Sequence, residues 1–249
     1  MNSKMNVVLL AANNTRSQAY VQALKEKNIN LESIIILNPP NRKSMVLDSS
    51  LKSNQVCNWV KEGMHIPDFS ISLHDTSANV ADNVIELDAS NVNDTNIVMQ
   101  LEKLKPDLVL YSGFGGQIVC NDLLKIAPFL HFHSGWLPGF RGSTTIYYSL
   151  LEEGRCGVSA ILLDDEIDTG VIVGRERFSA PPYGTELDHL YDGAIRAHVM
   201  VGVLSDWLRN GEFSFTEDQV QDSGEVYYVI HPVLKHIAIC KLKPDTKAY

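Results

Sequence analysis

Short runs of apolar residues alternate with helix-like segments through much of this chain. The runs at 7–11 (VVLLA), 31–37 (LESIIIL) and 107–112 (DLVLYS) are almost continuously apolar, as expected for strands that are buried on both faces of a parallel sheet. Segments with helical spacing lie between them, at 17–27, 48–63 and 94–104. Because strand–helix–strand order gives parallel strands joined by right-handed crossovers, the sequence predicts a three-layer α/β fold with a mostly parallel sheet.

The length of 249 residues suits one large domain with a short appendage. We expect a catalytic domain over 1–210 that ends with a long helix at 185–209, capped by Thr185. A C-terminal extension over 211–249 should hold a strand at 226–230. No apolar run approaches the roughly 20 residues that span a bilayer, and the N-terminus lacks the pattern of a signal peptide. We therefore expect a cytoplasmic protein with no membrane partner.

Charge and cysteine usage narrow the functional classes. The net charge of −9, from 30 acidic and 21 basic residues, argues against broad nucleic-acid binding, which usually needs a basic face. The four cysteines are scattered and form no CxxC pair. A disulfide scaffold and a cysteine zinc site are therefore not expected.

The stretch 129–170 carries the strongest functional signal. His131 and His133 are one residue apart in an apolar, strand-like run, so both should face the same side of the sheet. A second strand at 158–163 leads into an acidic turn that contains Asp168. We expect the two neighbouring strands to deliver the histidines and the aspartate to one strand end, where open α/β sheets bind their ligands.

These three side chains could support acyl transfer to an amine. A neutral imidazole can accept a proton near pH 7, a neighbouring carboxylate orients the ring, and an N–H donor can stabilise a tetrahedral oxyanion. His131, His133 and Asp168 are accordingly the catalytic candidates. Taken singly, each has a structural alternative: a hydrogen-bonded histidine at a strand end, or an aspartate that forms a turn.

The first strand-to-helix turn offers a second candidate site. Exposed N–H groups at a helix N-terminus bind phosphate, and Asn13 and Arg16 lie at this turn. They are the candidate substrate-binding residues. The turn lacks glycines, however, and a turn capped by Thr15 or Ser17 remains the alternative.

Three segments, taken in order, resemble one enzyme family. They are HFHSGWLPGFRG at 131–142, GVS at 157–159 and DEIDTG at 165–170. The set resembles the formyltransferases that use 10-formyltetrahydrofolate, which include methionyl-tRNA formyltransferase, glycinamide ribonucleotide transformylase and the sugar N-formyltransferases. The resemblance implies a Rossmann-like core and 10-formyltetrahydrofolate as the donor.

The resemblance also implies roles by position. His133 matches the catalytic histidine and Asp168 the catalytic aspartate, whereas His131 stands where the family has asparagine. Histidine can also donate an N–H, so this departure could preserve oxyanion stabilisation, alter the acyl donor or mark a degenerate site. The residues implied at the cofactor pocket are Tyr111, Gly115, Gln117, Ile118, Leu137, Pro138, Asp164 and Ile167.

The layout is most similar to that of the sugar N-formyltransferases. The chain shows neither a long basic C-terminal barrel, as in methionyl-tRNA formyltransferases, nor the glycine-rich phosphate loop of the glycinamide ribonucleotide enzymes. We therefore expect a primary amine on a nucleotide-linked amino sugar as acceptor, no nucleic-acid partner, and a homodimer as one option for assembly. The alternatives are a formyltetrahydrofolate hydrolase or related acyl transferase, a non-catalytic folate-binding protein, and a metal hydrolase built on His131, His133 and Asp168. For the formyltransferase that we favour, no metal is expected.

Overall fold

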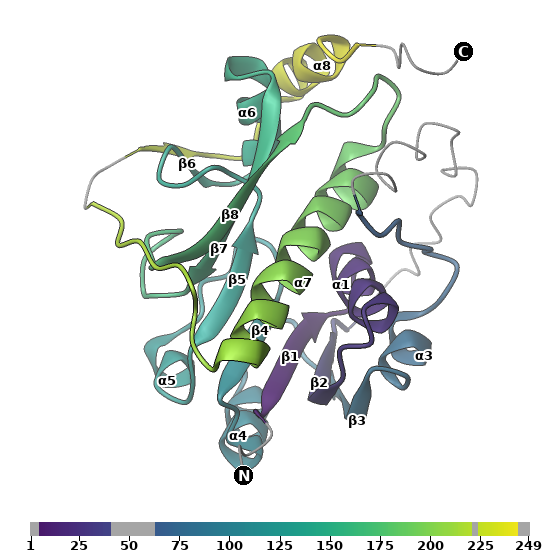
Figure 1. Ribbon diagram of the computed structural model, residues 1–249, viewed down its shortest axis with the longest axis vertical. Coiled ribbons are helices and arrows are strands. Elements are labelled where there is room, and N and C mark those ends of the chain that lie inside the picture. The colour runs from purple at the N-terminus through teal and green to yellow at the C-terminus, as the bar shows by residue number, and fades with distance from the viewer. Residues whose placement is uncertain (1–4, 41–62, 221–223, 244–249) are drawn as a thin grey trace.

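A seven-stranded sheet with helices on both faces forms the body of the protein (Figure 1). The computed structural model describes residues 5–40, 63–220 and 224–243. The helix predicted at 48–63 falls outside these residues except for Gly63. The strand order is β3-β2-β1-β4-β5-β7-β8. This arrangement confirms the predicted three-layer α/β fold.

The five strands from β3 to β5 in this order run parallel, and β7 and β8 extend one edge, each antiparallel to the strand it follows in the sheet. The strands of this sheet are β1 (Val7–Ala12), β2 (Leu31–Asn38), β3 (Ala81–Asp88), β4 (Leu108–Ser112), β5 (Phe129–His133), β7 (Arg155–Leu162) and β8 (Ile172–Ser179). The strand order reverses between β1 and β4. In open α/β sheets, the crevice at such a reversal is the usual place for a ligand.

Two apolar cores lie on opposite faces of the sheet. Side chains alternate along β1, so that Leu9 belongs to one core and Val8 and Leu10 to the other. The helices α1 and α7 pack side by side over the first core (Figure 1), and α4 and α5 cover the second. The helices are α1 (Thr15–Glu26), α3 (Leu73–Ser77), α4 (Thr95–Leu104), α5 (Asn121–Leu124), α6 (Thr145–Glu152), α7 (Asp192–Asn210) and α8 (Pro232–Cys240).

Two helix caps differ from the sequence-based expectation. The side chain of Asn14, and not that of Thr15 or Ser17, caps α1 by accepting a hydrogen bond from the Ser17 N–H at 3.0 Å. The long helix begins with a π-helical turn whose first N–H groups are satisfied by the Glu186 carboxylate, so Thr185 is not the cap. A carboxylate reaches several N–H groups at once, which a threonine hydroxyl cannot do.

Residues 224–243 return to the loop that follows β5. The strand β9 (Glu225–Tyr227) is shorter than the predicted 226–230 and pairs with β6 (Phe140–Gly142). The ring of Tyr227 stacks on Phe140 with 5.5 Å between centroids, and α8 packs against α6. Among the described residues, no helix combines the length and the apolar character that crossing a membrane requires.

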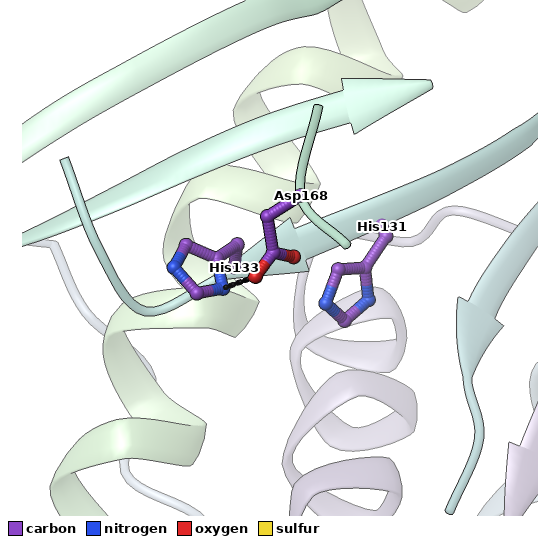
Figure 2. A group of neighbouring side chains, drawn as sticks. All are labelled: His131, His133 and Asp168. Carbon is purple, nitrogen blue, oxygen red and sulfur yellow. Dashed lines mark ion pairs between the residues drawn. The ribbon is translucent and has the colours of Figure 1, made fainter. Parts of the chain in front are cut away.

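We expected β5 and β7 to end at the same edge of the sheet, which would bring His133 and Asp168 together. Instead, β7 runs antiparallel to β5. Leu162 lies beside Leu130, near the start of β5, and Ser159 lies beside His133. The end of β7 is therefore not at the carboxyl end of β5. Asp168 reaches the histidines because the loop 163–171 returns towards His133, and Figure 2 shows the Asp168 carboxylate beside that ring.

Gly170 makes this return possible, because a Cβ at that position would lie 1.8 Å from the Leu162 carbonyl oxygen. We predict that Gly170→Ala lowers the free energy of unfolding by about 1–3 kcal/mol, measured by urea denaturation. The control is Gly202→Ala in α7, where an added Cβ meets nothing within 4 Å and stability should rise by up to about 1 kcal/mol. Equal stability of the two variants would contradict this account of the loop.

Candidate active site

The structure places the three predicted catalytic side chains next to one another (Figure 2). His131 and His133 project from the same side of β5, and Asp168 approaches them from the returning loop. A donor atom from each of the three lies within 4.8 Å of the others. The site is enclosed: His133 is 4% exposed and Asp168 9% exposed.

Asp168 is also held by the backbone, through the same oxygen that faces His133. Its Oδ2 atom lies 3.3 Å from Nδ1 of His133 and accepts a hydrogen bond from the Gly142 N–H at 2.8 Å. Gly142 has a φ of +96°, and a Cβ there would lie 2.2 Å from the Tyr227 carbonyl oxygen. Only glycine suits both conditions, so the position of this carboxylate depends on the chain at β9.

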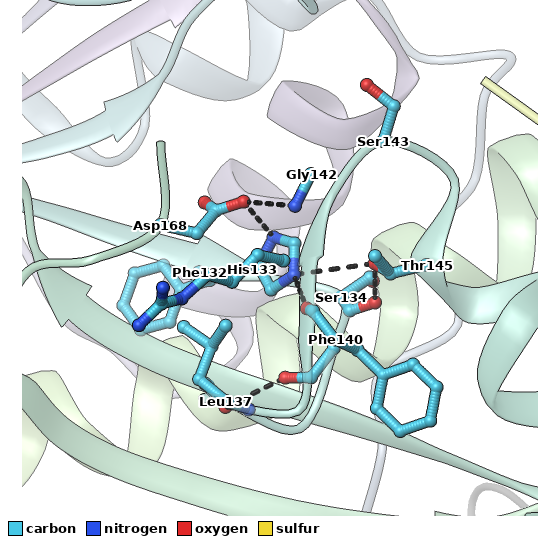
Figure 3. A network of polar contacts seen from close by, with 12 residues as sticks. Phe132, His133, Ser134, Leu137, Phe140, Gly142, Ser143, Thr145 and Asp168 are labelled. Atoms are coloured by element: carbon cyan, nitrogen blue, oxygen red, sulfur yellow. Dashed lines mark hydrogen bonds and ion pairs between the residues drawn. The ribbon is translucent and has the colours of Figure 1, made fainter. Parts of the chain in front are cut away.

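The other ring nitrogen of His133 faces a backbone acceptor. Nε2 lies 2.7 Å from the Phe140 carbonyl oxygen and 3.4 Å from the Thr145 hydroxyl, which itself donates to the Ser134 carbonyl (Figure 3). A carbonyl can only accept, so Nε2 carries the proton. The ring orientation is thereby fixed, and Nδ1 is directed towards Asp168.

His131 is neutral at physiological pH. Burial lowers the pKa of His131 well below its ordinary value, and the charges of Arg196 and Arg16 lower it further. Its Nδ1 atom and the Tyr111 hydroxyl are buried and lack hydrogen-bond partners among the described residues, and the two rings lie 5.7 Å apart. Burial raises the pKa of Tyr111 to about 12. Unpaired buried polar atoms are uncommon in proteins, and here they adjoin the proposed reaction centre.

A largely buried charge cluster, which the sequence did not predict, fixes the backbone around His133. Asp192, at the start of α7, accepts a hydrogen bond from Ser134 and pairs with Arg196 at 2.8 Å. Arg196 in turn donates to the Phe132 carbonyl. In the sequence, Asp192 and Arg196 look like an ordinary helical i,i+4 pair. Only the packing of α7 against the sheet shows that they hold both neighbours of His133.

Arg16 lies at the strand-order reversal. Its guanidinium donates to the Ser112 hydroxyl at 3.2 Å and to the Gly113 carbonyl, which joins the start of α1 to the end of β4. Asn13 donates instead to Asn38 at 2.7 Å. Both predicted substrate-binding residues are thus at the carboxyl edge of the sheet, and Arg16 is near enough to His131 to lower its pKa.

Two of the predicted cofactor residues use their side chains to form hydrogen bonds within or between loops. The Gln117 amide bonds to the Val92 N–H at 2.8 Å and to the Ser90 carbonyl at 2.7 Å. The Asp164 carboxylate accepts from the Thr169 hydroxyl at 2.7 Å, within the acidic turn. A role in cofactor binding would therefore fall to the backbone of these loops, and it stays a prediction.

Leu137 and Pro138 are joined by a cis peptide bond in the loop after β5. The Leu137 side chain is fully buried against Ile161 and Ile172, so it anchors the loop. Its N–H donates to the Ser159 hydroxyl at 3.0 Å. The packing explains why a large apolar residue stands here, and any contact of the loop with a cofactor stays a prediction.

Of the remaining predicted cofactor residues, Tyr111 is buried, and the other three are open to contact. Ile118 and Ile167 are 50% and 48% exposed, and the space around Gly115 is free within 4 Å of an added Cβ. A separate cavity of about 630 Å³ lies between α1, α7 and β8, and no predicted site residue lines it. Exposed isoleucines beside the catalytic edge suit an apolar ring system better than that distant cavity does.

Comparison with known proteins identifies the family. The formyl transferase pattern matches residues 5–197. The chain belongs to the formyl transferase family. A methionyl-tRNA formyltransferase from Helicobacter acinonychis is 37% identical over 87 residues, which cover 34% of this chain and 28% of that protein. The match thus spans less than a third of that relative's length.

Solved structures of this family share the fold. A sugar N-formyltransferase from a Shewanella species superposes with a TM-score of 0.56 at 14% identity, covering 95% of this chain and 87% of its own. The sugar 3N-formyltransferase WlaRD, solved in the presence of dTDP and 5-N-formyl-THF, has a TM-score of 0.52 at 15% identity, with 91% of this chain and 70% of its own covered. The predicted family and the predicted Rossmann-like core are confirmed.

The buried charge cluster can be tested through stability. We predict that Asp192→Asn lowers the free energy of unfolding by about 3 kcal/mol, because it leaves the buried Arg196 without its carboxylate. The control is Asp122→Asn, whose partner Lys125 lies 3.4 Å away on the surface, with an expected change within about 0.5 kcal/mol. Urea denaturation measures both. A small change in both variants would contradict the role assigned to the cluster.

Proposed function

We propose that the protein transfers a formyl group from 10-formyltetrahydrofolate to a primary amine. The observation that carries this proposal is the buried pair of His133 and Asp168, with His131 beside it, in a member of the formyl transferase family. The neighbour solved with 5-N-formyl-THF supports a reduced folate as the donor. The enclosed site would limit loss of the formyl group to water.

The amine nitrogen attacks the formyl carbon and gives a tetrahedral intermediate. Nδ1 of His133 is the ring nitrogen that is not committed to a backbone carbonyl, so the proton leaving the amine is handled at Nδ1 and Asp168. The same pair returns a proton to the departing folate nitrogen. A neutral His131 can donate its N–H to the oxyanion without adding a second positive charge beside the protonated His133 ring.

The acceptor that we favour is an amine on a nucleotide-linked amino sugar. Support comes from the two sugar N-formyltransferases that share the fold. Arg16 adds a cation at the strand-order reversal, near His131, where it could bind the phosphates of a nucleotide. The net charge of −9 disfavours an extended contact with a polynucleotide.

Methionyl-tRNA is the second candidate acceptor, because the relatives that match by sequence are methionyl-tRNA formyltransferases. Radiolabelled 10-formyltetrahydrofolate offered with methionyl-tRNA and with a panel of nucleotide-linked amino sugars separates the two. Label in an amino sugar supports our choice, and label in tRNA alone overturns it. Free formate without any labelled amine would instead favour the hydrolase.

Asp168→Asn should reduce turnover by at least about 100-fold, because the amide keeps the shape but cannot pair with a cationic ring. Its oxygen can still accept from the Gly142 N–H, so the melting temperature should change little. Single-turnover kinetics give the rate, and circular dichroism checks the fold. Near-normal turnover by a folded variant would remove Asp168 from the mechanism.

His131→Asn restores the residue of the family pattern. We expect turnover at least equal to that of the wild type, because an amide N–H replaces the imidazole N–H without introducing a titratable group. His131→Leu is the matched variant, since it fills similar space without a donor, and it should be impaired. Equal activity of the two variants would show that no N–H from this position reaches the oxyanion.

A further inference from the structure

We propose that His131, His133 and Asp168 form a binding site for a divalent metal ion, with Zn²⁺ as the best-matched cation. Two imidazoles and one carboxylate are ordinary zinc ligands, and three protein ligands leave one position open for water or substrate. All three donor atoms lie within 4.8 Å of one another in an enclosed part of the protein. The proposal concerns binding and does not depend on the proposed function.

The spacing between His133 and Asp168 fits a shared ion. Nδ1 and Oδ2 are 3.3 Å apart, which is longer than the roughly 2.7–2.9 Å of a charge-assisted hydrogen bond. Two ligands on one tetrahedral Zn²⁺ lie about 3.3 Å apart, given metal–ligand bonds of roughly 2.0–2.1 Å. These two donors therefore already have the separation that a bound zinc ion requires.

The contacts around this pair are those of a metal site. Ligating histidines usually donate their second N–H to a carbonyl or carboxylate, which fixes the tautomer. Nε2 of His133 does so with the Phe140 carbonyl at 2.7 Å, which leaves Nδ1, the nitrogen that faces the carboxylate, as the ligand atom. The Gly142 N–H donates to this same Oδ2 atom at 2.8 Å and so holds the proposed ligand oxygen in place.

His131 supplies the third ligand. Figure 2 shows one of its ring nitrogens on the side of Asp168 and the other on the far side. To close the site, the ring needs to move by at most about 1.5 Å, the difference between 4.8 Å and the tetrahedral spacing. The asparagine of the family pattern offers only an amide, which is a weak zinc ligand. The metal site is thus a property of chains with histidine at this position.

A bound metal would use the same Nδ1 and carboxylate atoms that the proposed formyl transfer needs. Metal binding and transfer should therefore exclude each other, an inference that, unlike the binding itself, rests on the proposed function. Zn²⁺ should inhibit the wild-type enzyme, and a chelator should restore the activity. This effect would distinguish the chain from relatives that carry asparagine.

The test is titration of chelator-treated full-length protein with Zn²⁺ by calorimetry, and with Co²⁺ by visible absorption. We expect one ion per chain and the intense Co²⁺ bands of a four-coordinate site. His131→Asn and Asp168→Asn should each weaken Zn²⁺ binding at least tenfold. Removing a residue that only hydrogen-bonds to a ligand already lowers metal affinity by about 10–100-fold, and these variants remove a ligand itself. Absence of stoichiometric binding, or binding unchanged in both variants, would overturn the proposal.

A surface pair requires a control. Sγ of Cys240 and Nε2 of His236 lie 3.4 Å apart on α8 and could bind zinc adventitiously. All titrations are therefore repeated in a His236→Ala, Cys240→Ser background, whose activity should equal that of the wild type. Retained binding there supports the buried site, and loss of binding there refutes it. Because binding is measured without folate or amine, the result stands whether or not the protein transfers formyl.

Discussion

The His133 ring is held between the Phe140 carbonyl and the Asp168 carboxylate. Several segments that are distant in the sequence must adopt specific conformations to place these two groups. The loop after β5 must turn back to present that carbonyl, and the loop after β7 must return along the sheet to present the carboxylate. The Gly142 N–H joins the two loops through Asp168, while β9 closes over β6. The geometry of the candidate active site therefore depends on the packing of residues 224–243.

Near the His133 ring, charged side chains can be buried because positive and negative groups lie close to one another. Arg16 and Arg196 are opposed by Asp192 and Asp168 within one enclosed region. Burial opposes the charged form of Arg196, but Asp192, Tyr20 and Asp168 together outweigh it and raise the pKa of Arg196. His131 stays neutral in this field. A neutral ring can serve either as an N–H donor to an oxyanion or as a metal ligand, so histidine at this position is compatible with both the proposed formyl transfer and the proposed metal site.

The sequence predicted the fold because each buried strand is short, apolar and followed by a helix, and the strand period placed His131 and His133 on one side. It predicted that Asp168 would join them, but for the wrong reason: strand direction depends on tertiary packing, and β7 is antiparallel to β5. Asp192 and Arg196 were missed because burial of a polar pair on a helix leaves no local signal. The caps at Asn14 and Glu186 were missed because several capping residues stood side by side.

A crystal structure with 5-formyltetrahydrofolate, a non-transferring analogue of the donor, tests the central claim most directly. The account predicts the folate at the carboxyl edge of the sheet, with its reactive nitrogen region within hydrogen-bonding reach of His131 or of the His133–Asp168 pair. The pterin should lie against the loops that contain Ile118 and Ile167. Folate bound elsewhere, such as in the cavity between α1, α7 and β8, with the His133–Asp168 pair untouched, would contradict it.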